Sequence, residues 1–133
     1  MKDRTLFSGG RFEKLGGYAR ARQVGPFIWL AGTTATEPTG QLHAPGDTYA
    51  QCCYIFERFE QALNELGAEM RHIVRTQAFL TQMDAAGDYV RAHGETFEGI
   101  FPATAAVEAK LTTPGMMVEI QADAFVPEFW PQK

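Results

Sequence analysis

The carboxylate best suited to chemistry in this sequence belongs to Glu119, which interrupts a run of alternating apolar residues from 118 to 126. This alternation predicts a half-buried strand, with Glu119 on the face opposite the apolar side chains. A partly buried carboxyl group at this position could activate water or transfer a proton. An ion pair with an arginine, within the sheet or across a subunit contact, would explain the position equally well.

Tyr18, Arg20 and Arg22 are spaced two residues apart, so a strand would project all three side chains from one face. Two guanidinium groups beside a phenol could bind a carboxylate, because arginine presents two parallel donors to a planar anion. An exposed edge strand with alternating charges would show the same pattern.

His93 falls on a predicted helix, four residues before Phe97 and at the edge of the apolar stripe. There it either hydrogen-bonds a backbone carbonyl or faces a pocket as an acid or base. The three histidines are too scattered to predict a metal site. The adjacent Cys52 and Cys53 are interpreted as buried helical thiols, because neighbouring cysteines on a helix do not reach disulfide geometry without strain.

Motifs for cofactors and activated nucleophiles are absent from the sequence. It contains no G-x-G-x-x-G, G-x-x-x-x-G-K-[ST] or H-E-x-x-H pattern, and its one serine, Ser8, lies outside a G-x-S-x-G turn. We therefore expect no metal, no organic cofactor and no serine hydrolase.

The composition indicates an ordinary globular protein. Its 133 residues suit a single domain, residues 1–133, with 45% hydrophobic and 21% charged residues. A net charge of −4 gives no basic surface for nucleic acid. No apolar run approaches the roughly 18 residues that span a bilayer, and no signal peptide is visible. We expect a cytoplasmic protein that binds neither membranes nor nucleic acid.

Apart from a short edge strand at 6–7, the patterns follow the order strand, strand, helix, strand, helix, strand, strand. The first helix is expected to begin with a capping box of Thr48 and Gln51 and to end at Gly67. The second is expected to start at Asp84 and to run through Ile100. The longer predicted strands cover residues 18–24, 27–32 (buried on both faces), 72–80, 102–111 and 117–126.

These elements fit an α+β fold with one mixed sheet of about six strands. Both helices are expected on the same face of the sheet, because each has one apolar stripe to bury. The other face then lacks a cover within the chain. We expect further copies of the chain to cover it.

Four segments lie in the order and spacing of a known family, between about Tyr18 and Val126. They are Tyr18-x-Arg20, Leu30-Ala31-Gly32-Thr33-Thr34, Phe101-Pro102-Ala103-Thr104 and Val118-Glu119-Ile120-x-Ala122. With these segments the chain resembles the RidA/YjgF family, once labelled the L-PSP endoribonuclease family. The resemblance implies a chorismate-mutase-like fold and a homotrimer with three pockets at the subunit clefts.

The resemblance also implies a chemistry. Archetypal members hydrolyse imines and enamines derived from amino acids, releasing ammonia and a 2-keto acid. Their pattern uses an arginine after Pro-Ala to hold the substrate carboxylate, a glutamate in Val-Glu-Ile to activate water, and a tyrosine from the first strand. This sequence keeps Tyr18 and Glu119 but has Thr104 where the arginine would stand. It therefore resembles a branch that lacks the usual catalytic arginine.

Other positions of the family pattern also differ: Ala106 replaces a pocket cysteine, Ala31 a serine, and His93 an asparagine. Arg20 or Arg22 is a hypothetical replacement for the missing anion anchor. The expected site has Glu119 and His93 as catalytic residues, with a small, carboxylate-bearing metabolite bound by Tyr18, Arg20, Ala31, Thr33, Thr104 and Ala106.

Three functions follow from the resemblance. The first is a hydrolase or deaminase acting on a small imine, enamine or related compound. The second is a trimer that binds or senses a small molecule without catalysis. The third, RNA cleavage, follows from the older family label alone, and the acidic net charge argues against it.

Overall fold

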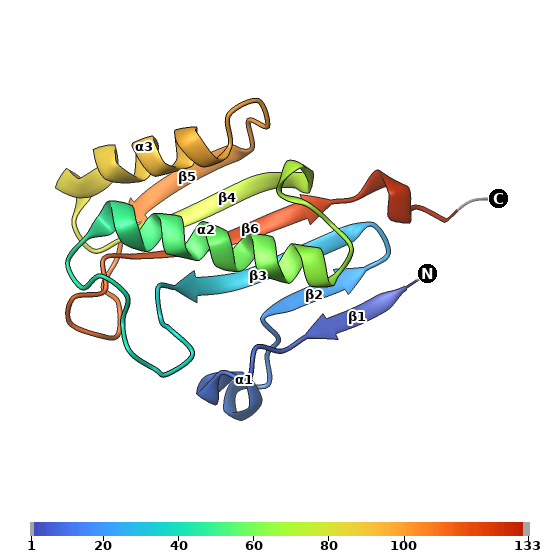
Figure 1. Ribbon diagram of the computed structural model, residues 1–133, viewed down its shortest axis with the longest axis horizontal. Helices are drawn as coiled ribbons and strands as arrows, with labels where there is room; N and C mark the ends of the chain where they lie inside the picture. The colour runs from blue at the N-terminus through green and yellow to red at the C-terminus, as the bar shows by residue number, and fades with distance from the viewer. Residues whose placement is uncertain (1, 132–133) are drawn as a thin grey trace.

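The computed structural model describes residues 2–131 and contains one six-stranded sheet in the order β1-β2-β3-β6-β4-β5. Helices α2 and α3 lie side by side on one face of this sheet (Figure 1). The elements are β1 (Asp3–Leu6), α1 (Arg11–Gly16), β2 (Ala21–Val24), β3 (Phe27–Thr34), α2 (Thr48–Glu65), β4 (Ile73–Leu80), α3 (Ala86–Thr96), β5 (Ala103–Glu108) and β6 (Val118–Phe125). The predicted α+β fold with two helices on one face of a mixed sheet is confirmed.

Strand direction explains the path of the chain. β4 and β5 are parallel, whereas the remaining neighbours in the sheet are antiparallel. Parallel neighbours need a crossover connection, and α3 provides it between β4 and β5. β5 is consequently an edge strand that lies beneath α3 (Figure 1).

The core lies between the sheet and the two helices. On β6 the residues Val118, Ile120, Ala122 and Ala124 are buried, and Glu119 and its alternate neighbours face the opposite side, as predicted. From α2 the buried aromatic and aliphatic residues Phe56, Phe59 and Leu63 pack against them. Burial of this apolar surface is the main force that holds helices and sheet together.

The prediction that β3 is buried on both faces is wrong for the single chain. Ile28 and Leu30 face the helices, but Phe27 and Trp29 point to the other side and remain 43% and 46% exposed. Phe27 stacks on Trp29 and packs against Phe125 of β6. The uninterrupted apolar sequence thus reflects a buried face and an aromatic cluster on the face that no helix covers.

The start of α2 differs from the predicted capping box. Asp47 is the N-cap, and its carboxylate accepts a hydrogen bond from the Ala50 backbone N–H at 3.0 Å. Gln51 is fully buried instead, where its amide donates to the carbonyl oxygens of Ala44 and Gly115 and accepts from the Met117 N–H. A side chain that joins two loops in this way cannot also reach back to the helix terminus.

The helix α3 is shorter at both ends than predicted. Asp84 lies in a short 3-10 turn (Met83–Ala85) and caps nothing, and the helix begins at Ala86. It ends at Thr96, short of the predicted Ile100, because Gly99 follows with a left-handed φ of 80°. At the end of α2, Gly67 takes the left-handed conformation (φ 77°) that was expected of it.

The cap assignment can be tested by substitution. Replacing Asp47 with alanine should lower the free energy of unfolding by about 1 kcal/mol, because the Ala50 N–H loses its acceptor. Asp84→Ala is the matched control and should change it by less than about 0.5 kcal/mol. Urea denaturation of both variants provides the measurement, and an equal loss in the two would contradict the assignment.

Candidate functional site

Four polar side chains meet beneath α3 at the edge of the sheet. The Thr76 hydroxyl lies 2.8 Å from the Thr104 hydroxyl and 2.8 Å from Nε2 of His93. The Tyr89 hydroxyl lies 2.7 Å from that of Thr104 and 3.3 Å from that of Thr76. We call Thr76, Tyr89, His93 and Thr104 the hydroxyl cluster.

Secondary structure explains why these residues converge. In the parallel pairing of β4 and β5, Thr76 and Thr104 are register partners, so both point toward the helices. Tyr89 and His93 are one helical turn apart on α3, and their side chains share the face that packs on the sheet. Sheet register and helix periodicity therefore bring together residues 28 positions apart in sequence.

The cluster is electrically neutral at neutral pH. His93 packs between the rings of Phe56, Tyr89 and Phe97, with centroid distances of 4.6 to 6.0 Å, and burial lowers its pKa. Burial likewise raises the pKa of Tyr89 and keeps the phenol protonated. The cluster therefore offers hydroxyl and imidazole hydrogen bonds but no net charge.

The cluster is also accessible. Thr76 is buried, but Thr104 is exposed on the edge strand, and His93 is half-buried. When Thr76 donates its single hydrogen to Thr104, Nε2 of His93 must donate to Thr76. The Thr104 hydrogen then remains for Tyr89 or for a ligand. Ala106, two residues along β5, lies on the same face beside Ala78 and is half-buried.

Glu119 lies on the other face of the sheet. Its register partners are Thr34 on β3 and Phe79 on β4, whereas the alternate residues of β6 point toward the helices. Within residues 2–131 its carboxylate has no ion pair or hydrogen bond, so the expected arginine partner is not found in the single chain. The chain does not bring Glu119 to His93.

Gly32 leaves the space that the Glu119 carboxylate occupies. A Cβ atom at position 32 would lie 2.8 Å from Oε2 of Glu119, which is closer than Cβ contacts in proteins allow. The pairing of β3 with β6 shifts register between Leu30 and Thr33, so Gly32 lies within an irregular stretch of the strand. The absence of a side chain at residue 32 therefore leaves room for the Glu119 carboxylate in this position.

Tyr18, Arg20 and Thr33 form a second group at the β2 side of the sheet. Nη1 of Arg20 donates to the Gly32 carbonyl and to the Thr33 hydroxyl, both at 2.9 Å. The Arg20 guanidinium also lies 5.8 Å from the centre of the Tyr18 ring. The Ala31 backbone N–H donates to the Arg20 carbonyl at 3.0 Å. These four predicted site residues are therefore neighbours.

The predicted common face for Tyr18, Arg20 and Arg22 is wrong for Arg20, whereas Tyr18 and Arg22 line the same hollow. β2 begins only at Ala21, so the period-two argument does not extend to Tyr18 and Arg20. Arg20 lines a pocket under α2, whereas Arg22 is exposed and forms an ion pair with Asp3 at 2.9 Å. Three strands (β3, β6 and β4) separate β2 from β5, so neither arginine reaches Thr104 within one chain.

Sequence reasoning missed four residues that the structure places beside the predicted ones: Thr76, Tyr89, Glu13 and Arg58. The spacing of four between Tyr89 and His93 could have paired these two. Glu13 is buried on α1, a helix that was not predicted, and lies 3.5 Å from Nε of Arg20. The contacts of Thr76 and Arg58 depend on register and tertiary packing.

Neither a metal cluster nor a membrane span is found in the described part of the chain. No group of three or more His, Cys, Asp or Glu side chains in residues 2–131 is placed to hold a metal ion. Among the helices of the same residues, none combines the length and apolar character needed to cross a bilayer.

Because Thr76 is central to the hydroxyl cluster, removal of its hydroxyl group should lower the stability of the protein. Thr76→Val keeps the side-chain shape but leaves Nε2 of His93 without its partner and Thr104 with only Tyr89, which should lower the free energy of unfolding by about 1–3 kcal/mol. Thr113→Val, at an exposed loop position, is the matched control and should be close to neutral. Equal stability of the two variants in chemical denaturation would disprove the network.

Protonation of His93 should couple to stability. Its pKa in the folded chain lies below the ordinary 6.5, so between these two values the unfolded chain binds a proton that the folded chain excludes. The free energy of unfolding should therefore fall as pH decreases from about 6.5 toward the lower folded-state value. His93→Asn should reduce this dependence when the two proteins are unfolded in urea across pH 5–8, and identical slopes would argue against a buried imidazole.

Comparisons with known proteins agree with this fold. The family model described as Endoribonuclease L-PSP matches residues 9–126. The chain is 31% identical to Protein DfrA of Myxococcus xanthus over 129 residues, covering 93% of this chain and 96% of the relative. It is 26% identical to the 2-iminobutanoate/2-iminopropanoate deaminase of Mus musculus over 110 residues, covering 83% and 82% of the two chains.

Solved structures point the same way. A Mycobacterium tuberculosis protein described as a member of the YjgF/YER057c/UK114 family superposes with a TM-score of 0.84 at 35% identity. The match covers 94% of this chain and 100% of the other. Together with the family model, this similarity shows that the chain belongs to the RidA/YjgF (L-PSP endoribonuclease) family.

Proposed function

We propose that the protein is a hydrolase of the deaminase type, acting on a small imine, enamine or related carbonyl compound. The observation that carries the proposal is the neutral hydroxyl cluster, whose exposed member, Thr104, stands at the position of the family arginine. The deaminase name of the mouse relative supports the reaction class. RNA cleavage is not proposed, because the net charge is −4 and phosphate backbones are bound by basic surfaces.

The exchange of arginine for threonine bears on the substrate. An arginine holds a carboxylate through two charge-assisted hydrogen bonds, whereas a hydroxyl supplies one neutral bond. A carboxylate buried against Thr104 alone would lose its hydration without a compensating charge. The group bound at the hydroxyl cluster is therefore an uncharged carbonyl, amide or imine, and His93 is connected to it through the hydroxyl groups of Thr76 and Thr104.

A homotrimer, as the family resemblance implies, completes the proposed site. Within one chain Glu119 and His93 lie on opposite faces of the sheet, so a cleft that uses both needs a second copy. The uncovered face, with Phe27, Trp29 and Phe125, and the edge strand β5 provide surfaces for that contact. In this arrangement Glu119 activates water, and Tyr18 and Ala31 line the cleft together with Thr104 and Ala106, whereas Arg20 and Thr33 belong to the pocket under α2.

A binding or sensor protein is the second candidate, and the separation of Glu119 from His93 favours it. If neighbouring copies do not unite these residues, the hydroxyl cluster can bind a carbonyl compound but has no carboxylate to activate water. The two candidates share the ligand class and differ in turnover.

Ammonia release from freshly generated 2-imino acids and their uncharged amide analogues tests the proposal. The wild type should accelerate hydrolysis of the amide analogues more than that of the acids. Glu119→Ala should reduce the rate by about 100-fold or more, the range found for loss of a general acid or base. Thr104→Arg should shift the preference toward the acids, because it restores a charge for their carboxylate.

Glu60→Ala is the control, because Glu60 is exposed on α2, which covers the face of the sheet opposite to that of Glu119. Its rate should match that of the wild type. A wild-type rate equal to that of buffer for both substrate sets would refute the hydrolase. Saturable binding of the amide analogues in the same samples would then support the sensor.

A further inference from the structure

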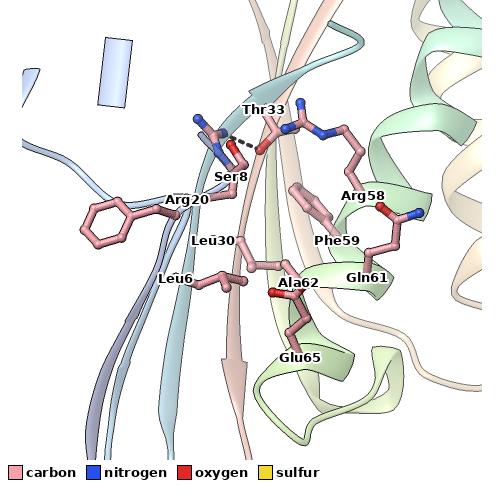
Figure 2. A pocket seen from close by; sticks show the side chains of 11 residues that line it. Leu6, Ser8, Arg20, Leu30, Thr33, Arg58, Phe59, Gln61, Ala62 and Glu65 are labelled. Carbon is pink, nitrogen blue, oxygen red and sulfur yellow. Dashed lines mark hydrogen bonds between the residues drawn. The ribbon is translucent and has the colours of Figure 1, made fainter. Parts of the chain in front are cut away.

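A pocket separate from the hydroxyl cluster lies between α2 and the β1–β2 side of the sheet. Its volume is about 110 Å³, and its open rim is formed by the exposed Gln61 and Glu65 of α2. Figure 2 shows Arg20 and Arg58 pointing into the same end of this pocket, on either side of the Thr33 hydroxyl. Two cations therefore share one small cavity.

Arg58 has no carboxylate partner among residues 2–131. Its Nη1 donates to the carbonyl oxygens of Thr34 and Thr36 at 3.2 and 3.4 Å, which leaves its other nitrogens free. Burial, and next the charge of Arg20, lower the pKa of the Arg58 guanidinium. A cation that is half-buried beside another cation is stabilised by any anion that enters the pocket.

Only some of the hydrogen-bond donors of Arg20 have partners among residues 2–131. Its Nη1 makes the two bonds described above, but its Nε is buried without a hydrogen bond, 3.5 Å from the Glu13 carboxylate. That carboxylate already accepts hydrogen bonds from the Ser8 backbone N–H and hydroxyl. Burial pushes the pKa of Glu13 up, but the Ser8 bonds and the Arg20 charge outweigh it, so the pKa falls and Glu13 stays ionised.

The remaining negative charge is remote from the guanidinium groups. Glu65 lies at the opposite end of the pocket from Arg20 and Arg58 (Figure 2). Among the carboxylates in residues 2–131 that line the pocket or pair with its arginines, only that of Glu13 accompanies the two positive charges at the arginine end. One small anion would balance the remaining positive charge.

We propose that Arg20 and Arg58 bind a small oxyanion, either a carboxylate or a phosphate group, in this pocket. Guanidinium groups suit both, because each presents parallel N–H donors to two oxygens. The Thr33 hydroxyl, between the two arginines, lies within the same binding region. Strands β6 and β4 separate Thr33 from Thr104, so the site is distinct from the hydroxyl cluster, and it goes beyond the proposed function because its occupation requires no catalysis.

Calorimetric titration of the full-length protein tests the site, with inorganic phosphate in one arm and propanoate in the other, both at constant ionic strength in chloride. At least one anion should bind saturably. Arg58→Gln should weaken that binding by roughly tenfold or more, the expected effect of losing a charge-assisted contact. Arg91→Gln, which removes an exposed charge on α3, should bind as the wild type does.

NMR of the wild-type arginine Nε–H groups gives a second readout that does not depend on a variant that folds. The signals of Arg20 and Arg58 should shift with the titration, while that of Arg91 should not. Absence of saturable binding for both anions, or binding unchanged in Arg58→Gln, would overturn the proposal. The titration contains no imine, so its outcome is independent of whether imines are hydrolysed.

Discussion

The alternation of β6 decides which functional groups of this protein can meet. β6 pairs with β3 on one side and β4 on the other, and its helix-facing residues form the centre of the core. A shift of one residue in its register would move every apolar side chain out of the core, so the register is strongly fixed. The same constraint holds Glu119 on the uncovered face and leaves the hydroxyl cluster under α3.

The two polar groupings solve the problem of burial in different ways. The hydroxyl cluster contains no ionised group, because the aromatic surroundings of His93 disfavour its charged form. The pocket under α2 retains charge, and hydrogen bonds to backbone carbonyl oxygens and to Thr33 support its two arginines. The neutral hydroxyl cluster and the cationic pocket therefore suit ligands, or parts of a ligand, of different polarity.

Much of the fold can be predicted from the sequence, because the spacing of apolar residues along a strand or helix is a local property. The alternation of β6 and the apolar stripe of α2 were both predicted correctly, and they suffice to place the core. The helix cap was less predictable. Gln51 has the spacing from Thr48 that a capping box requires, but its side chain hydrogen-bonds to two loops instead. The apolar run of β3 could not reveal that one of its faces lacks a cover within the chain.

The functional residues were less predictable than the fold for a related reason. Thr76 and Thr104 become partners through the parallel register of β4 and β5, which no local pattern encodes. In the sequence, Arg58 is an ordinary polar residue of an amphipathic helix. Its position depends on the carbonyl oxygens of Thr34, at the end of β3, and of Thr36 in the following loop. Family resemblance identified Thr104 and Glu119, but only the coordinates show that they face opposite sides of one sheet.

The contact between Gly32 and Glu119 has a consequence for how such chains diverge. Because the carboxylate occupies the volume next to the bare Cα of residue 32, a side chain at that position would displace it. A relative that acquires a side chain at this point of β3 must rotate, shorten or lose the acid opposite it. Glycine here is thus the steric counterpart of the glutamate on the neighbouring strand.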